Sequence, residues 1–330
     1  MGLNVLSLFD GCAGAFQALK HLKIGVNAYY ACEIDPYAIQ VAKKNHPEII
    51  HLGDVTKGDF TQYKEVDLLI GGSPCTDLSV AKRNREGLAG ASSNLFYEYV
   101  RALGEVKPKY FLLENVASMK STERDKISEI LGVRPIMINS ALLTAQSRKR
   151  YYWTNISNVI QPEDKGILLK DIIEDGFTER HKSLCVTATY SRVCPNDYFL
   201  DSSRQMIFTK PVFLGGIEGR DWAKDGKKLS RNYPQGNRVY SVEGKSVTLS
   251  ANGGGKGSKT GLYEMKQLVA SELKPIVRRL TPIECERLQG FPDNYSEGVS
   301  NTQRYKMMGN GFTVPVISHI LSFADWGSDV

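Results

Sequence analysis

The chain has 330 residues, of which 42% are hydrophobic and 24% are charged, a composition typical of a globular protein with a sizeable core. No apolar run approaches the roughly 20 residues that a membrane helix needs, and the N-terminus enters a strand pattern without a basic leader segment. We therefore expect a cytoplasmic protein that contacts no membrane and has one large domain, alone or with an insert.

The six cysteines favour free thiols in a reducing compartment. They form no C-x-x-C pair and have no histidine at zinc spacing, so the sequence predicts neither a disulfide framework nor a metal site. A cysteine of this chain is therefore available as a nucleophile.

Strand and helix patterns alternate over the first half of the chain. Short apolar segments predict strands at residues 4–9, 27–33, 49–54, 66–71, 109–114 and 134–139. Helical spacing is found at residues 16–22, 37–45 and 95–106. This alternation predicts an α/β fold with a mostly parallel, doubly wound sheet, in which ligands bind beyond the carboxyl ends of the strands.

Chemically useful residues follow five of these predicted strands. They are the glycine turn of Gly11 and Gly14, then Glu33, Asp54, Cys75 and Glu114. Each alone has an ordinary explanation: Asp54 could cap a turn, and an isolated Cys75 is more often a small buried side chain. Together at one sheet edge they predict an active site.

The glycine turn also indicates a cofactor. An acid about 20 residues after such a turn is typical of a site that binds the ribose of a nucleoside. The turn lacks the third glycine of the dinucleotide fingerprint and has no basic side chain to neutralise a pyrophosphate. A nucleoside cofactor without phosphates fits better, and S-adenosylmethionine is the common one.

Eight motifs occur in the order of the sequence blocks of one enzyme family. They are SLFDGCAG, EIDPYA, GDVT, GGSPCTDLS, LLENV, QSRKRYYW, LTPIECERLQGFPDNY and MGNGFTVPV. By these motifs the chain resembles the cytosine-C5 DNA methyltransferases, most of all the compact phage and bacterial enzymes, with some similarity to the vertebrate de novo enzymes. It departs from the bacterial pattern at Thr76, where many members have Gln, and at Ala13, where many have Gly.

The resemblance implies that Cys75 is the nucleophile. Carbon 5 of cytosine is too weak a nucleophile to take a methyl group, so a thiolate must first add to carbon 6. Pro74 fixes one backbone angle, and Gly71 and Gly72 permit a close approach to the cofactor. These residues would present the sulfur of Cys75 at the mouth of a strand.

Three further residues complete the catalytic set that the resemblance implies. Glu114 would meet the N3 and exocyclic amine edge of the base. Arg148 and Arg150 are two residues apart and would face the same side of a strand. One would grip the base carbonyl and the other would hold Glu114 or the target phosphate, whereas without the resemblance plain surface charge would be the simpler interpretation.

The resemblance also implies a cofactor pocket built from both ends of the chain. Phe9 would stack near the adenine, Glu33 would bind the ribose and Asp54 the adenine amine. The predicted cofactor-binding set is Phe9, Asp10, Gly11, Gly14, Glu33, Ile34, Asp54, Val55, Pro74, Leu95, Asn310, Gly311 and Phe312. The last helix must therefore fold back against the first strand, so that the two ends share one domain.

The positive charge gathers outside the motif blocks. The segment from residue 204 to residue 259 contains eleven Lys or Arg and four Asp or Glu, whereas the whole chain has a net charge of only +6. This asymmetry is expected where one face meets phosphate, although a solvated surface would also explain it. We expect residues 157–277 to form a smaller target-recognition domain, and residues 1–156 and 278–330 to form the catalytic domain, of the Rossmann-like S-adenosylmethionine-dependent methyltransferase fold.

Two groups of residues are expected to contact DNA. A basic lid after the nucleophile contains Lys82, Arg83 and Arg85. The recognition domain contributes Arg220, Lys227, Lys228, Arg231, Arg238, Asn252, Lys256 and Lys259. The glycine-rich run around residues 253–257 could equally be a turn between two strands. At residue 281 a capping box of Thr281, Pro282 and Glu284 predicts the helix that restarts the catalytic domain.

The preferred interpretation is a sequence-specific DNA (cytosine-5)-methyltransferase that flips its target base out of double-stranded DNA. We expect it to act as a monomer in a bacterial or phage-infected cell, with a cognate restriction endonuclease as a possible partner. Two alternatives stay open. One is a transfer RNA cytosine-C5 methyltransferase, and the other is a DNA-binding relative without catalysis, against which the intact catalytic set argues.

Overall fold

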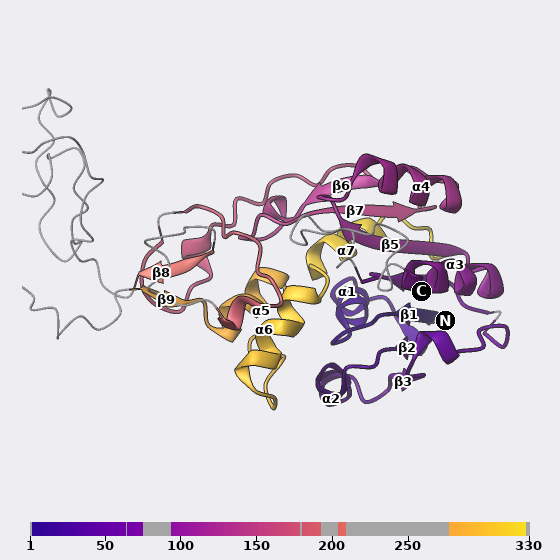
Figure 1. Cartoon of the computed structure of the whole chain (residues 1–330), viewed down its shortest axis with the longest axis horizontal. Helices are drawn as coiled ribbons and strands as arrows, with labels where there is room; N and C mark the ends of the chain where they lie inside the picture. The colour runs from indigo at the N-terminus through magenta and orange to yellow at the C-terminus, as the bar shows by residue number, and fades with distance from the viewer. Residues whose placement is uncertain are drawn as a thin grey trace, which may run out of the picture.

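The computed structural model of the chain describes residues 2–63, 65–74, 94–178, 180–192, 204–208 and 277–327. Its centre is a seven-stranded sheet with the order β3-β2-β1-β4-β5-β7-β6 (Figure 1). The strands are β1 (Leu3–Leu8), β2 (Val26–Cys32), β3 (Ile50–His51), β4 (Leu68–Gly71), β5 (Tyr110–Val116), β6 (Ile136–Asn139) and β7 (Lys149–Thr154). The pairs from β3 to β5 are parallel, and β7 runs antiparallel to both of its neighbours.

The described residues form seven α-helices, and several of them cover the two faces of this sheet. They are α1 (Gly14–His21), α2 (Pro36–Asn45), α3 (Asn94–Val106), α4 (Ser121–Leu131), α5 (Pro282–Gln289), α6 (Asn301–Asn310) and α7 (Val314–Leu321). Strand β1 shows why two faces are needed, because Val5 joins a core with α1, α2 and α7 while Leu6 and Leu8 join a second core with α3 and α4. The predicted α/β, doubly wound architecture is confirmed.

Helix α5 begins where the sequence predicts. Thr281 Oγ1 accepts from the Glu284 amide, the Glu284 carboxylate accepts from the Thr281 amide, and Pro282 occupies the first turn. The helix ends at Gly290, whose φ of 78° lies in the left-handed region that favours glycine.

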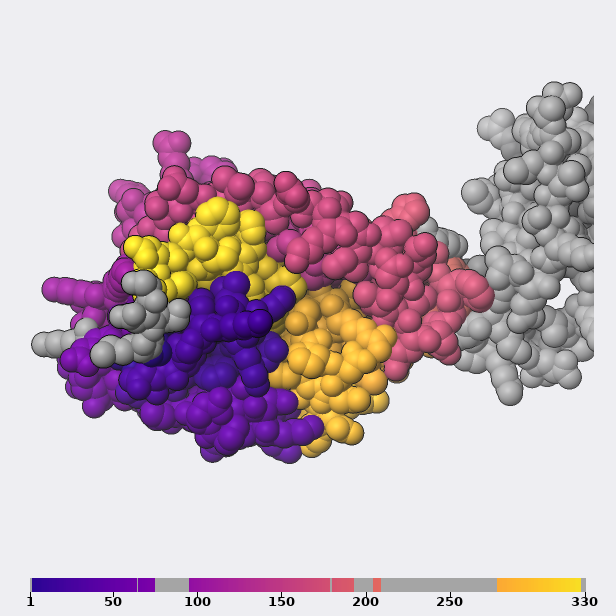
Figure 2. All heavy atoms as spheres, turned by 180° about the vertical axis from the view of Figure 1, so that it is seen from behind, coloured from indigo at the N-terminus to yellow at the C-terminus, as the bar shows by residue number. Residues whose placement is uncertain are grey.

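The C-terminal segment folds back onto the start of the chain. Helix α7 packs on α1, where Ser318 Oγ donates to the Ala18 carbonyl at 3.2 Å, and Ile317 shares the core of Val5. Figure 2 shows from behind that the yellow C-terminal atoms lie directly against the indigo N-terminal atoms. Both ends of the chain therefore build one core.

The described part of the predicted recognition segment is attached to the same core. A small antiparallel sheet joins β8 (Met206–Phe208) to β9 (Val277–Arg279). Leu169, Val186 and Tyr190 are buried in the cluster that also contains α5 and α7. Short 3-10 turns occupy Val55–Lys57, Ser140–Leu142, Leu169–Asp171 and Tyr190–Arg192. Within the ranges that the structure describes, no helix is long and apolar enough to span a membrane.

Candidate active site

A cavity of about 400 Å³ opens beside the carboxyl ends of β1, β2, β4 and β5. It adjoins the point where the strand order reverses between β1 and β4, the expected ligand site of such sheets. Its lining contains every predicted cofactor residue except Gly14, together with Glu114, Arg148 and Arg150. Gly14 lies at the start of α1, where an added Cβ would lie 3.4 Å from the side chains of Phe291 and Phe312. Gly14 therefore permits close packing of α1 against the C-terminal segment.

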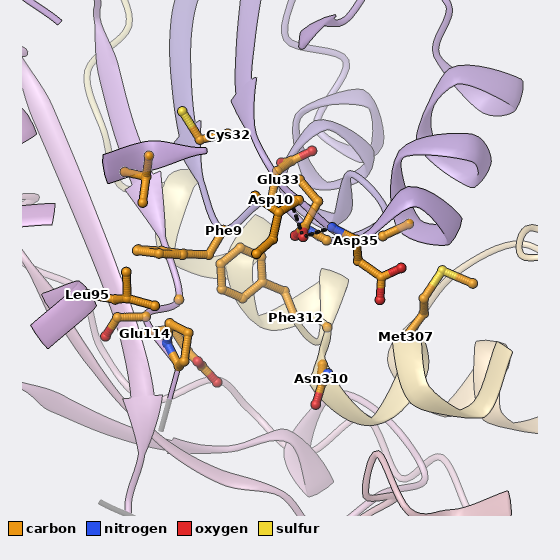
Figure 3. A pocket seen from close by; sticks show the side chains of 18 of the residues that line it. Phe9, Asp10, Cys32, Glu33, Asp35, Leu95, Glu114, Met307, Asn310 and Phe312 are labelled. Carbon is orange, nitrogen blue, oxygen red and sulfur yellow. Dashed lines mark hydrogen bonds between the residues drawn. The ribbon is translucent and has the colours of Figure 1, made fainter. Parts of the chain in front are cut away.

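The turn after β1 is strained and is held by an acid from β2. Phe9, Gly11 and Ala13 have φ angles of 58°, 61° and 65°, all in the left-handed region, which costs a residue with a Cβ about 1–2 kcal/mol. Glu33 Oε2 accepts from the Gly11 amide at 2.8 Å, and Glu33 Oε1 accepts from the amides of residues 34 and 35 at the same distance. Glu33 thus fixes the turn while its carboxylate lines the cavity (Figure 3).

Asp10 is buried beside the cavity with one carboxylate oxygen unpartnered. Its Oδ1 accepts from Ser7 Oγ and Tyr29 OH, both at 2.6 Å, whereas Oδ2 has no hydrogen-bond partner among the described residues. Burial raises the pKa of Asp10 to about 7. An ammonium group next to Oδ2 would satisfy both the oxygen and the charge, and the methionine end of S-adenosylmethionine carries such a group.

Apolar and acidic side chains complete the fit to an adenosyl group. Phe9 and Ile34 line the cavity, and Ile34 is 72% exposed, an unusual state for a large aliphatic side chain. Asp54 Oδ1 accepts from the amide and hydroxyl of Thr56 at 3.0 and 2.8 Å, and these bonds lower the pKa of Asp54. A flat apolar base and an amine donor therefore both find matching groups.

Glu114 and Arg150 form an ion pair in the cavity wall. Arg150 Nε lies 2.8 Å from Glu114 Oε1, and only 14% of each side chain is exposed. Glu114 stands within β5, opposite Tyr152 of β7, because the strand continues to Val116 beyond its predicted end. Of the two arginines, Arg150 is therefore the one that contacts Glu114.

Arg148 has different partners from Arg150. It lies one residue before β7 and is 4% exposed. Its guanidinium donates to the backbone carbonyls of Val186 at 3.2 Å, Gly309 at 3.0 Å and Gly311 at 3.1 Å. Its Nη1 also donates to Cys185 Sγ at 3.4 Å. Both arginines line the cavity, but only Arg150 forms an ion pair with an acid among the described residues.

Two contacts at this site were missed from the sequence. Asn115 Nδ2 donates to the carbonyl and the hydroxyl of Ser73 at 3.3 and 3.2 Å, which ties β5 to the residue before Pro74. Lys306 Nζ lies 2.7 Å from Asp35 Oδ2, so an ion pair joins α6 to the cap of α2 across the cavity mouth. The LLENV motif contains the signal for the first contact, whereas nothing local in the sequence predicts the second.

Several predicted site residues lie outside the described residues. They are the nucleophile Cys75, the lid residues Lys82, Arg83 and Arg85, and the recognition residues Arg220, Lys227, Lys228, Arg231, Arg238, Asn252, Lys256 and Lys259. The described chain reaches Pro74, which lines the cavity directly before Cys75. In the described ranges no cluster of three or more His, Cys, Asp or Glu side chains could hold a metal ion.

Comparison with known proteins gives consistent matches over the whole chain. The family described as C-5 cytosine-specific DNA methylase matches residues 3–323. The orphan methyltransferase M.Rho11sI of Bacillus phage rho11s is 32% identical, over 96% of this chain and 69% of the phage protein. The type II methyltransferase M.HhaI of Haemophilus parahaemolyticus is 29% identical, over 97% of this chain and 93% of that protein.

Solved structures share the fold at low sequence identity. The Entamoeba histolytica methyltransferase EhMeth superposes with a TM-score of 0.64 at 14% identity, covering 98% of both chains. The S. pombe Dnmt2 methyltransferase superposes with a TM-score of 0.59 at 17% identity, covering 97% of both chains. This chain therefore has the same fold as other methyltransferases of known structure.

Proposed function

We propose that this chain, which belongs to the C-5 cytosine-specific DNA methylase family, methylates carbon 5 of a cytosine flipped out of one specific sequence of double-stranded DNA. The single observation that carries this mechanism is the shared cavity. Figure 3 shows Glu33 and Asp10 on one side and Glu114 on the other, with Phe9 and Phe312 between them. One side suits the cofactor and the other suits the base.

The family implies use of S-adenosylmethionine, which supplies an electrophilic methyl group on a sulfonium. Asp10 Oδ2 is the proposed partner of the cofactor ammonium, since burial leaves this oxygen without another donor. Glu33 is the proposed partner of the ribose hydroxyls and Asp54 of the adenine amine. Phe9 and Ile34 would hold the apolar faces of the adenosyl group and exclude water from it.

The chemistry on the base begins with Cys75. Its thiolate would add to carbon 6 of the cytosine, and the electron pair of the broken double bond would make carbon 5 able to attack the methyl group. Loss of the carbon 5 proton and of the thiolate would then restore the ring. Pro74 in the cavity lining supports this placement, because the next residue along the chain is the nucleophile.

Glu114 would stabilise the edge of the base on which negative charge develops. Arg150 holds one carboxylate oxygen of Glu114. The other, Oε2, lies on the side of Gly72, since a Cβ at residue 72 would be 3.3 Å from it. This oxygen is thereby aimed toward the strand mouth that leads to Cys75, where the N3 edge of a base attacked at carbon 6 would lie. Arg150 keeps Glu114 oriented through the planar geometry of its guanidinium.

Sequence recognition is proposed to lie in residues 157–277, inserted between the two parts of the catalytic domain at 1–156 and 278–330. The segment between residues 204 and 259 holds the basic excess that would bind phosphates. We propose further that the protein acts as a monomer in the cytoplasm. Its relatives include both orphan and type II methyltransferases, so a cognate restriction endonuclease is proposed only if a neighbouring gene encodes one.

The test of the mechanism is covalent trapping. Bisulfite sequencing of DNA from cells that express the protein would first identify the target site. A duplex with 5-fluorocytosine at that site should form a denaturant-resistant adduct with the wild-type protein and S-adenosylmethionine, because fluorine cannot leave as a proton does. The Cys75→Ser variant should bind the duplex without an adduct, and transfer RNA should not be methylated. Methylation by the Cys75→Ser variant would refute the covalent mechanism.

A further inference from the structure

Arg148 is a buried cation whose described partners are three backbone carbonyls and the Cys185 sulfur, to which Nη1 donates at 3.4 Å. Its side chain is 4% exposed, and within the described ranges no salt bridge joins it to a carboxylate. A guanidinium in such a place keeps its charge, so removal from water is offset mainly by the carbonyl oxygens around it. Moving this side chain away would leave a buried charge and buried carbonyl oxygens without hydrogen bonds, so it holds the backbone that it binds in place.

Two of these carbonyls belong to a wall of the cofactor cavity. Gly309 and Gly311 flank Asn310, and all three residues line the cavity; Figure 3 shows the Asn310 side chain there. Gln289 binds the same region: its Nε2 donates to the Met308 carbonyl at 2.5 Å, in the last turn of α6, and its Oε1 accepts from Thr313 Oγ1 at 2.7 Å, after the helix. The end of α6 and the short loop that follows it, together the cavity loop, are therefore held by two buried side chains, and Arg148 is the one that lines the cavity.

The third carbonyl belongs to the segment that leads into the recognition part of the chain. Val186 accepts from Arg148, and Gly309 lies directly against the residues that follow. A Cβ added to Gly309 would be 2.2 Å from the Ala188 nitrogen and 2.3 Å from the Thr187 carbonyl carbon. The cavity loop and residues 186–188 are thus in backbone contact, and Arg148 joins them.

From this geometry we propose that Arg148 is a positioning residue for methyl transfer. Its guanidinium fixes the Gly309–Gly311 wall of the cofactor cavity against residues 186–188, and thereby couples cofactor binding to the segment that enters the recognition domain. Both Nη atoms are used in four hydrogen bonds and Nε is buried as well, so a direct grip on the base carbonyl would require the side chain to leave a buried place. This inference rests on the proposed function, because it assumes that the cavity binds S-adenosylmethionine.

The experiment measures S-adenosylhomocysteine binding by calorimetry, with and without target DNA, for the full chain. Arg148→Met should weaken the binding about tenfold or more, since each lost charge-assisted hydrogen bond contributes appreciably. Arg148→Lys should recover part of the loss. Arg287→Met is the matched control, because Arg287 also donates to a carbonyl, that of Ile172 at 2.9 Å, but lies away from the cavity.

Steady-state kinetics separate positioning from base contact. In the Arg148 variants the KM for the cofactor should rise while kcat at saturating cofactor stays within a few fold. The factor by which DNA tightens cofactor binding should fall toward one, because the coupling is reciprocal. A base-gripping arginine would give the reverse, an unchanged cofactor affinity with a large loss of kcat, and that result would overturn the proposal.

A second variant keeps the test decisive if the Arg148 variants fold poorly. Gly309→Ala forces the loop away from Thr187 without removing a charge, and it should reproduce the loss of cofactor affinity and of coupling. Normal cofactor binding in Gly309→Ala and Arg148→Lys would overturn the inference. If the wild-type protein itself binds no S-adenosylhomocysteine, the proposed function fails instead, so the two failures are distinguishable.

Discussion

Two buried groups, Asp10 in the cavity lining and His46 after α2, should give the stability of the unliganded protein opposite dependences on pH. Asp10 is held by Ser7 and Tyr29, and burial raises its pKa to about 7. His46 follows α2, packs on Phe16 with ring centroids 4.4 Å apart, and has a pKa that burial lowers to about 4. Folding therefore favours the protonated form of Asp10 and the deprotonated form of His46.

The magnitudes follow from proton linkage. In the unfolded chain an Asp titrates near ~3.9 and a His near ~6.5. Between pH 4 and 7 the folded state holds the extra proton on Asp10, so the free energy of unfolding falls as pH rises, by about 4 kcal/mol in total. Between pH 4 and 6.5 the unfolded state holds the extra proton on His46, so the free energy of unfolding rises by about 3 kcal/mol. The two contributions nearly cancel.

The Asp10→Asn variant removes the contribution of Asp10 to this pH dependence. The amide does not titrate, so its free energy of unfolding should rise with pH relative to wild type, by about 1.4 kcal/mol per pH unit in the middle of the range. His46→Gln should change the slope in the opposite direction. Urea unfolding of the protein without cofactor at pH 4, 5, 6 and 7 measures both slopes. The slope is the diagnostic quantity, because the new amide nitrogen would itself be an unpartnered donor. Parallel curves for wild type and Asp10→Asn would refute the reasoning.

Cofactor binding near pH 7 should release a proton from Asp10, since an ammonium beside Oδ2 favours the carboxylate; heats that are the same in buffers of different ionisation enthalpy would contradict this. Gly72→Ala should lower turnover and cofactor affinity, because the new Cβ would lie 3.0 Å from the Phe312 ring. Gly104→Ala is the control, since open space surrounds this position in helix α3. It should stabilise the protein by about 1 kcal/mol and leave the activity unchanged. Asn115→Ala releases the chain before Pro74, so kcat should fall more than cofactor affinity, and equal losses in both would argue against this role.

The sequence was sufficient for most of the fold because the strands are short apolar segments with turn residues after them. It was less successful where the local pattern is weak. Helix α4 was not predicted, because only Ile127 and Leu131 of this polar segment are buried. Strand β3 covers only Ile50–His51, since the chain turns at Gly53, where φ is 80°. Apolar sequence patterns therefore predict buried strands and helices well, whereas half-exposed helices and the edge strands of the sheet are predicted poorly.

Some contacts of the candidate site could be predicted from the sequence and others could not. The residues that follow parallel strands could be predicted as neighbours, because the carboxyl ends of such strands meet at one edge. The partners of Arg148 could not, because Gly309 lies 161 positions away in the chain. Nor could the contact of Tyr295 OH with the Cys12 carbonyl, which spans 283 positions at 2.8 Å. Such pairs depend on how the last helices dock, and no local pattern encodes that docking.

The described residues on both sides of the proposed recognition segment are anchored in the core that contains β1 and α7. On the entry side Val186 and Tyr190 are buried in that core, and Arg148 binds the Val186 carbonyl. On the return side Arg278 forms a bidentate pair with Glu284, both bonds at 2.8 Å, and the Glu284 side chain is fully buried at the start of α5. Losing either anchor would expose core surface or leave a buried charge unpaired. Strand β8 (Met206–Phe208) pairs with β9, and its Ile207 is buried in the same core. An exchange of recognition segments that keeps the core intact therefore has to begin after residue 208 and end before residue 277, inside the wider limits of 157–277 that the sequence motifs suggest.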